Sequence, residues 1–188
     1  MWPTYGQLVL VAAAAFLLSA GGLSQPALAK RGGGGGGDEV VSPQVADICA
    51  HTPFPDVCRS TAGRHASKYP VIDNAAVLNM QVDAFARRTE QARKHVTKVS
   101  LGAPPQQIQA LSFCDTMYMN SQDTIGAAER AITFKDKATA NIMLQLAVQD
   151  FESCDRPFQQ NGIMNPMEKF DTELNQMANN CMALANMI

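Results

Sequence analysis

LSFCDTMYMNSQDTI (residues 111–125) and NIMLQLAVQDFESCDRPF (residues 141–158) are the two segments that decide the fold of this 188-residue chain. Each has the apolar spacing that is typical of an amphipathic helix, and each carries one cysteine. Cys114 and Cys154 are symmetric about Phe134, the middle of the connecting TFKDK, so an antiparallel helical hairpin places the two sulfurs level. This arrangement predicts a disulfide that closes a loop of about 40 residues and stabilises the fold by roughly 4 kcal/mol.

Four segments repeat the same helical spacing, with apolar residues alternately three and four positions apart. The segments cover residues 71–99, 108–132, 140–154 and 163–188. The apolar stripe of the first segment is expected to begin at Val71, that of the second at Ile108 and that of the fourth at Ile163. The turn sequences between the segments are short, which forces neighbouring helices to run antiparallel. We therefore predict an all-α fold with an antiparallel up-down-up-down four-helix bundle over residues 70–188.

A second pair of cysteines precedes the bundle. Ser42 and Pro43 open SPQVADICAHT, and PDVCRSTAGR begins with a proline, so both sequences predict short helices. Neither helix is long enough to be stable alone. Cys49 and Cys58 flank AHTPFPDV, whose prolines favour a turn. We predict an N-terminal, disulfide-stapled helical hairpin over residues 43–66.

The first 29 residues contain no charged side chain, and they include the apolar run LVLVAAAAFLL. This run is too short to span a bilayer comfortably, and Ala27 and Ala29 form an A-x-A cleavage site. We interpret residues 1–29 as a signal peptide and residues 30–42, with six consecutive glycines, as a flexible tail. The mature protein is expected to be secreted and to have no membrane segment.

Five cysteines after a secretion signal predict two disulfides and one free thiol, which allows fifteen arrangements. The helical geometry favours Cys49–Cys58 and Cys114–Cys154. Cys181 then remains as a free thiol in the apolar stripe of the last helix, where it is expected to act as a small buried hydrophobe. Whether Cys181 could mediate a dimer stays open.

No catalytic or cofactor motif is present. The sequence lacks Gly-x-Ser-x-Gly, His-Glu-x-x-His and Cys-x-x-Cys, and its histidines have no metal-ligand spacing. The formal net charge of −2 gives no reason to expect binding of nucleic acid or of a membrane surface. We predict a protein that is not an enzyme and needs neither cofactor nor metal.

Four motifs resemble the plant invertase and pectin methylesterase inhibitor family. ICAHTPFPDVC matches the opening Cys-x-x-Thr-x-x-Pro-x-x-Cys hairpin, while ALSFCDTMY, DFESCDRPF and NNCMALANMI match the helices that follow, in order. The resemblance implies both disulfides, a helical hairpin on a four-helix bundle, and an inhibitor domain over residues 43–188. It also implies a secreted protein of the apoplast or cell wall that inhibits a carbohydrate enzyme in a one-to-one complex and is monomeric before the complex forms.

The resemblance favours pectin methylesterase as the partner. Invertase inhibitors commonly carry Pro-Lys-Phe between bundle helices two and three, whereas ITFKDKATANI has Phe134-Lys135 without the proline and in the other order. In pectin methylesterase inhibitors, helices two and three cover the pectin cleft of the enzyme. The partner-binding positions of these inhibitors, counted along the chain from Cys114 and Cys154, correspond here to four residues: Thr116, Asn120, Asp123 and Ser153. Members often have acidic residues at the first three positions, of which Asp123 alone is acidic here.

Two alternatives remain open at this point. The partner could be a cell-wall or vacuolar acid invertase instead. The chain could also be an extracellular helical carrier of a small apolar ligand, which would require a cavity in the bundle. Each of the four partner-binding positions could equally be an ordinary exposed helix position.

Overall fold

A computed structural model describes residues 41–188 of the chain. The expected signal peptide and all of the glycine-rich tail except residues 41 and 42 lie outside the described residues. The described part is all helical, as predicted, and contains a helical hairpin and four long helices.

The hairpin consists of α1 (Pro43–Cys49), α2 (Pro55–Ala62) and the 3₁₀ helix η1 (Gly63–Lys68). Pro43 and Pro55 each stand in a first turn, where the missing N–H removes a donor that would have no partner. The Cys49–Cys58 disulfide joins the two α-helices, and both cysteines are fully buried.

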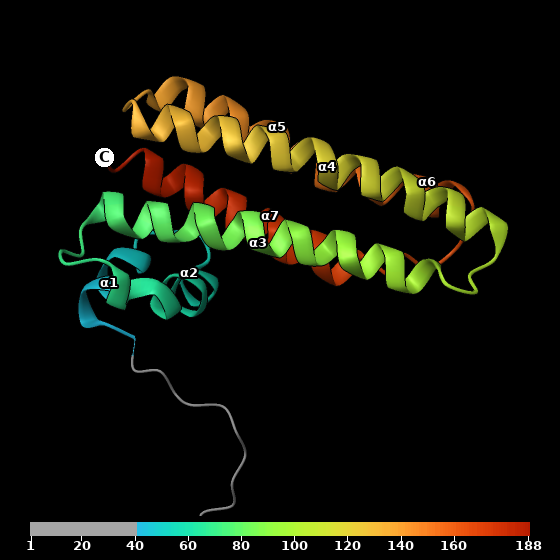
Figure 1. Ribbon diagram of the computed structural model, residues 1–188, viewed down its shortest axis with the longest axis horizontal. Helices are drawn as coiled ribbons and strands as arrows, with labels where there is room; N and C mark the ends of the chain where they lie inside the picture. The colour runs from blue at the N-terminus through green and yellow to red at the C-terminus, as the bar shows by residue number, and fades with distance from the viewer. Residues whose placement is uncertain (1–40) are drawn as a thin grey trace, which may run out of the picture. The chain divides into compact units, whose positions relative to one another are not determined.

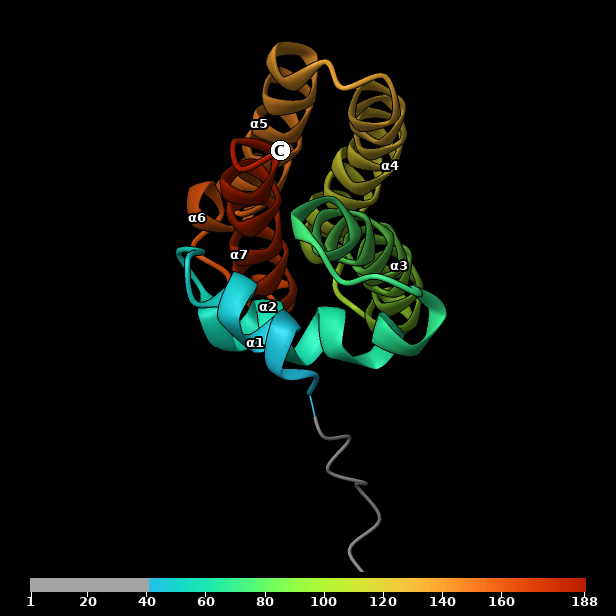
Figure 2. The same cartoon turned by 90° about the vertical axis from the view of Figure 1, so that its left-hand side faces the viewer.

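The bundle consists of α3 (Asn74–Ser100), α4 (Pro105–Thr133), α5 (Lys137–Cys154) and α7 (Glu168–Ala185). Figure 1 shows the four long helices running side by side, and the end-on view of Figure 2 places them in the order α3, α4, α5 and α7 around the bundle. The hairpin packs on the side formed by α3 and α7, away from α4 and α5. The predicted four-helix bundle is confirmed.

Large side chains fill the interior of the bundle. Tyr118, Phe85 and Phe151 are at most 1 % exposed, and the ring centroids of Phe85 and Phe151 lie 5.6 Å apart in an edge-to-face arrangement. Such aromatic pairs contribute beyond the area that they bury. Cys181 is buried and free, and burial raises the pKa of its thiol.

Val71 and Ile108 do not belong to the apolar stripes as predicted, and α7 does not begin at Ile163, although the Ile163 side chain packs against the core. Val71 is 67 % exposed because Asp73 caps α3, accepting a hydrogen bond from the Ala76 amide at 2.8 Å, so the helix begins after Val71. Ile108 is 44 % exposed. It lies six residues before Cys114, which at 3.6 residues per turn places it about 120° away around α4.

Ile163 lies in the turn before α7, which begins five residues later at Glu168. Pro166 disfavours helical backbone in the residue that precedes it, so the helical spacing does not start a helix there. The turn is held by Asn165, whose side-chain oxygen accepts a hydrogen bond from the Met167 amide at 2.8 Å. The short helix α6 (Arg156–Gln160), which lies between α5 and this turn, was not predicted.

Two buried amides attach the hairpin to the bundle. Asn180 of α7 accepts a hydrogen bond from the Phe54 amide and donates one to the Phe54 carbonyl, both at 2.9 Å. Gln81 of α3 donates to the Cys58 carbonyl at 2.9 Å and to the Thr61 hydroxyl at 2.5 Å. Because Asn180 and Gln81 are fully buried, these bonds fix the position of α2 against the bundle.

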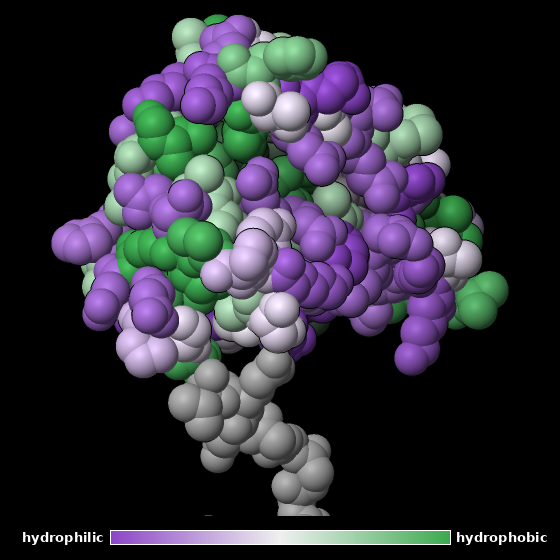
Figure 3. Space-filling view, turned by 60° about the vertical axis from the view of Figure 1, so that its left-hand side comes forward, coloured by the Kyte–Doolittle hydropathy of each residue, from purple (hydrophilic) through white to green (hydrophobic). Residues whose placement is uncertain are grey.

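The face shown in Figure 3 is mostly hydrophilic, with hydrophobic side chains in small groups. Among the described residues, none of the helices combines the length and the apolar character needed to cross a bilayer.

Candidate functional site

The Cys114–Cys154 disulfide joins α4 to α5, with 4.7 Å between the two Cα atoms. Both cysteines are fully buried in the core. In an antiparallel pair, a residue a given number of positions after Cys114 lies level with the residue the same number before Cys154. The disulfide therefore sets the register of every side chain along this pair of helices.

Contacts with α3 and with the C-terminal turn after α7 show which sides of α4 and α5 lie next to each other. Arg93 of α3 pairs with Asp115 of α4 at 2.9 Å, so the Asp115 side of α4 faces α3. On α5, Asn141 donates to Asn186 at 2.9 Å, which places its side of α5 toward α7 and the C-terminal turn. The opposite side of each helix, which we call its shoulder, borders the seam, the line along which α4 and α5 pack together.

The four predicted partner-binding residues lie on these seam-flanking shoulders. Thr116, Asn120 and Asp123 are four and three residues apart, so they share one exposed face of α4. Ser153 of α5 is partly exposed and lies close to the level of Thr116, beside the disulfide. Asp123 lies about 10 Å further along α4, level with Gln145 and close to Leu146.

Local hydrogen bonds leave much of this polar surface available. The Thr116 hydroxyl donates to the Ser112 carbonyl at 3.1 Å, and the Ser153 hydroxyl donates to the Gln149 carbonyl at 2.7 Å. Asp123 is exposed and forms no hydrogen bond or ion pair with any residue of the described chain. Its carboxylate is therefore free to accept hydrogen bonds from a partner.

Exposed apolar side chains lie on the same shoulders, beside the four polar residues. Phe113 is 37 % exposed, three residues before Thr116, and Ile142 and Leu146 are 55 % and 40 % exposed on the turns of α5 that lead to Ser153. Their signal in the sequence is that they are large and apolar but fall outside the core stripes. Together with the four polar residues, they form a mixed surface that we call the α4–α5 face; its members are Phe113, Thr116, Asn120, Asp123, Ile142, Leu146 and Ser153.

A partly buried polar network connects α4 to α7 and to the turn before α7. The Tyr118 hydroxyl donates to the Asp171 carboxylate at 2.5 Å and lies 3.7 Å from the Cys154 sulfur. The Asn165 amide donates to Asp171 at 3.2 Å and to Asp155 at 3.1 Å. Burial raises the pKa of Asp171 to about 6, although the hydrogen bond from Tyr118 opposes this shift. Burial and the neighbouring Asp171 charge raise the pKa of Tyr118.

The connection between α4 and α5 is a tight turn. Thr133 ends α4, and Lys135 has a φ of 58°, in the left-handed region. The Lys135 amide donates to the Ile132 carbonyl at 3.0 Å and the Asp136 amide to the Ala131 carbonyl at 2.8 Å, which is a Schellman motif. Phe134 is 81 % exposed at the tip.

The α4–α5 face has the mixed apolar and polar composition that protein-binding surfaces commonly have. Within residues 41–188, no group of three or more His, Cys, Asp or Glu side chains is placed to hold a metal ion. The face combines exposed apolar contact area with hydrogen-bonding groups, as the centre and rim of protein interfaces do.

A family profile described as plant invertase/pectin methylesterase inhibitor matches residues 43–184. The chain belongs to this family. Proteins of the family are proteinaceous inhibitors, and the family resemblance drawn from the four motifs is confirmed.

Solved structures with this fold include two pectin methylesterase inhibitors. A mutant form of a pectin methylesterase inhibitor from Arabidopsis aligns with a TM-score of 0.63 at 16 % identity and covers 78 % of this chain and 98 % of its own. A pectin methylesterase inhibitor from Arabidopsis thaliana aligns with a TM-score of 0.57, also at 16 % identity, and covers 78 % of this chain and 96 % of its own. A search of curated proteins gives no match.

Proposed function

We propose that this family member inhibits a pectin methylesterase by forming a one-to-one complex through its α4–α5 face. The observation that carries the proposal is the set of exposed apolar and polar side chains beside the Cys114–Cys154 disulfide. The bridge and the antiparallel packing hold both helices in one arrangement before the partner arrives, which reduces the ordering cost of binding.

The pectin methylesterase is preferred to an invertase because of the α4–α5 connection. The family resemblance associates invertase inhibitors with Pro-Lys-Phe at this point, and this chain has Thr133, Phe134 and Lys135 instead. Both structures of similar fold are also of pectin methylesterase inhibitors.

One observation favours an acid invertase as the second candidate. Phe134 is 81 % exposed, and the left-handed backbone of Lys135 turns the chain at the tip of the loop. An apolar ring and a cation at the tip could enter a concave active site. Variants of Phe134 separate the candidates, since they should affect inhibition of an invertase more than inhibition of a pectin methylesterase.

The third hypothesis, a carrier of a small apolar ligand, requires space inside the bundle. Tyr118, Phe85 and Phe151 instead occupy the interior and pack against one another. This packing supports an inhibitor over a carrier.

We further propose that residues 1–29 are removed on secretion and that the protein acts in the apoplast or cell wall. The two disulfides support an oxidising compartment, because such bonds are rare where thiols are kept reduced. Mass spectrometry of the protein recovered from a plant culture medium would test this. A chain that starts at Lys30 is expected.

Paired substitutions test the binding face. Asp123→Ala with Ser153→Ala should weaken inhibition of the pectin methylesterase about tenfold, which corresponds to about 1.4 kcal/mol. Thr97→Ala with Lys98→Ala on α3 is the matched control, since Thr97 and Lys98 are exposed but lie off the α4–α5 face. Circular dichroism should be unchanged in both double variants. Equal inhibition by the test pair and the control pair would exclude this face as the binding site.

A further inference from the structure

A second cleft lies on the other side of the bundle, between the hairpin and helices α3 and α7. It has a volume of about 240 Å³, and residues of α2, η1, α3 and α7 line it. Three arginines and one carboxylate are among the lining side chains: Arg64, Arg87, Arg88 and Glu173. Arginine side chains are common ligands of carboxylate and phosphate groups, so the partners of each arginine in the cleft decide whether it is available to a ligand.

Arg88 and Glu173 neutralise each other within this cleft. Arg88 donates to the same oxygen of Glu173 through Nη2 at 2.6 Å and through Nε at 3.1 Å, and its guanidinium lies 4.1 Å from the ring centroid of Phe170. The pair is held in place and contributes little net charge to the cleft. The other two guanidinium groups of the wall belong to Arg64 and Arg87; Arg87 is itself paired with Asp83, so among the described residues the cation of the wall without a counter-charge is Arg64.

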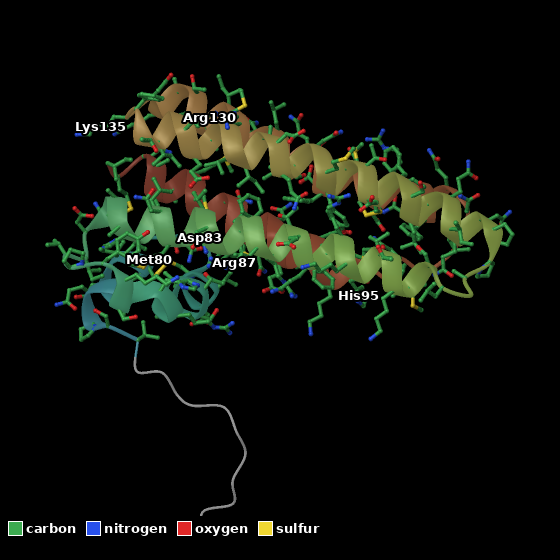
Figure 4. The ribbon with its side chains drawn as sticks, in the orientation of Figure 1. Met80, Asp83, Arg87, His95, Arg130 and Lys135 are labelled. Carbon is green, nitrogen blue, oxygen red and sulfur yellow. A yellow bond between two sulfur atoms is a disulfide. The ribbon has the colours of Figure 1, made fainter. Side chains whose placement is uncertain are left out.

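The Arg87 guanidinium is held by two neighbours and still has N–H groups that they do not use. Its Nη1 pairs with Asp83 at 2.5 Å, and its Nη2 lies 2.6 Å from Nε2 of His65, which must accept because a guanidinium only donates. Figure 4 shows Asp83 and Arg87 on the side of α3 that faces the hairpin. A guanidinium has five N–H groups, so Arg87 can still donate to a ligand.

Arg64 is exposed and forms no hydrogen bond or ion pair with any residue of the described chain. Its backbone is nevertheless fixed, because η1 follows α2 directly and Gln81 binds both Cys58 and Thr61 of α2. An arginine on a fixed backbone, with an unused fork of donors, is suited to bidentate binding of a carboxylate.

We propose that this cleft binds a uronate unit of an anionic polysaccharide, with its carboxylate between Arg64 and Arg87. Ser60 and Gln91 also line the cleft and offer neutral polar groups to sugar hydroxyls. The volume is below the ~300–1,000 Å³ of pockets that enclose drug-sized ligands, so one unit of the polymer enters and the rest of it lies outside.

The choice of a uronate rests on the proposed function, because pectin is a polymer of uronate units and is the substrate of the proposed target. The cleft lies on the α3 and α7 side, whereas the α4–α5 face lies across the bundle. The protein could therefore hold de-esterified pectin while it inhibits the enzyme that produces it.

Calorimetric titration of the oxidised protein with trigalacturonate, in the absence of any enzyme, tests the proposal. Saturable binding is expected, weakened about tenfold by Arg64→Ala, which loses the bidentate contact, and less by Arg64→Lys, which keeps the charge. Arg156→Ala is the control, because Arg156 is an exposed cation on α6 outside the cleft, and binding should not change. The fully methyl-esterified trisaccharide should bind at least about fivefold more weakly, since it lacks the charge.

Three results would overturn the proposal. Trigalacturonate could show no saturable binding, or Arg64→Ala and Arg156→Ala could weaken it equally, which would indicate general charge attraction. Inorganic phosphate could bind as tightly as trigalacturonate, which would exclude a uronate site. Inhibition of a pectin methylesterase is measured separately, and Arg64→Ala should leave it unchanged. A chain that binds trigalacturonate but does not inhibit refutes the proposed function alone.

Discussion

The Tyr118 hydroxyl of α4 donates a hydrogen bond to the Asp171 carboxylate of α7, with 2.5 Å between the two oxygens. The two residues are separated by 53 positions in the sequence. Their contact joins two helices of the bundle and takes the carboxylate partly out of water. The cost of that burial makes the fold sensitive to pH.

The stability of the protein should rise as the pH falls from 7 to 4. The pKa of Asp171 is raised from 3.8 to about 6 in the folded state, so the folded state binds the proton more tightly. This contribution is fully present below the unfolded pKa and is lost as the pH rises through about 6; a shift of this size corresponds to about 3 kcal/mol. Asp155 and Glu168 face Asp171 and raise its pKa further, while Asn165 lowers it.

Urea unfolding at pH 4 and pH 7 measures this effect. The difference in unfolding free energy between the two pH values should be smaller in Asp171→Asn than in the natural chain by up to about 3 kcal/mol. Comparing the two proteins cancels the contributions of the other titrating groups, which both contain. One of these groups is Asp150, whose pKa is also raised by burial. An identical difference in both proteins would show that Asp171 does not titrate in this range.

Loss of Asn180 should loosen the hairpin. Asn180→Ala removes two hydrogen bonds, so the backbone amide and carbonyl of Phe54 lose their partners. This loss should lower the unfolding free energy by about 2–3 kcal/mol. Hydrogen exchange at the Phe54 amide should become faster.

Asn179→Ala is the matched control for this change. Asn179 bonds only to Asn175 within its own helix, so its loss should have little effect. If both variants lost the same stability, Asn180 would not be the anchor of the hairpin.

The two disulfides should contribute unequally to stability. Replacing Cys114 and Cys154 with alanine opens a loop with a sequence separation of 40, against a separation of 9 for Cys49 and Cys58. Loop entropy predicts losses of about 4 and about 3 kcal/mol. Thermal unfolding of the two double variants compares these losses, and a larger loss for the hairpin pair would contradict the entropic account.

Glycine at position 135 should stabilise the turn between α4 and α5. Lys135 has a φ of 58°, which costs an ordinary side chain about 1–2 kcal/mol and costs glycine little. Glycine also raises the entropy of the unfolded chain, which offsets part of this gain. The unfolding free energy of Lys135→Gly should therefore increase by about 0.5 kcal/mol. Lys137→Gly, in the first turn of α5, should instead lose stability. The opposite order of the two variants in denaturant unfolding would show that the turn is not strained.

The sequence predicted those features that depend on local spacing. The symmetry of Cys114 and Cys154 about Phe134 predicted their bridge, because antiparallel helices have a fixed rise per residue, and the structure contains it. Spacing failed where a cap or a proline ended the pattern, as at Val71 and Ile163.

Features that depend on distant contacts were not predicted. No local signal connects Tyr118 to Asp171, or Phe54 to Asn180, which are 126 residues apart. The partner-binding role comes from family resemblance and stays a prediction for Thr116, Asn120, Asp123 and Ser153. The exposed side chains of Ile142 and Leu146 became informative only when the packing showed which shoulder of α5 they occupy.

The most direct test of the account is a side-by-side titration of the oxidised protein against a pectin methylesterase and an acid invertase at mildly acidic pH. The pectin methylesterase should be inhibited with an endpoint at one inhibitor per enzyme, and the invertase should keep its activity. Inhibition of the invertase alone would move the function to the second candidate. Full activity of both enzymes at a saturating concentration of the protein would show that it inhibits neither of them.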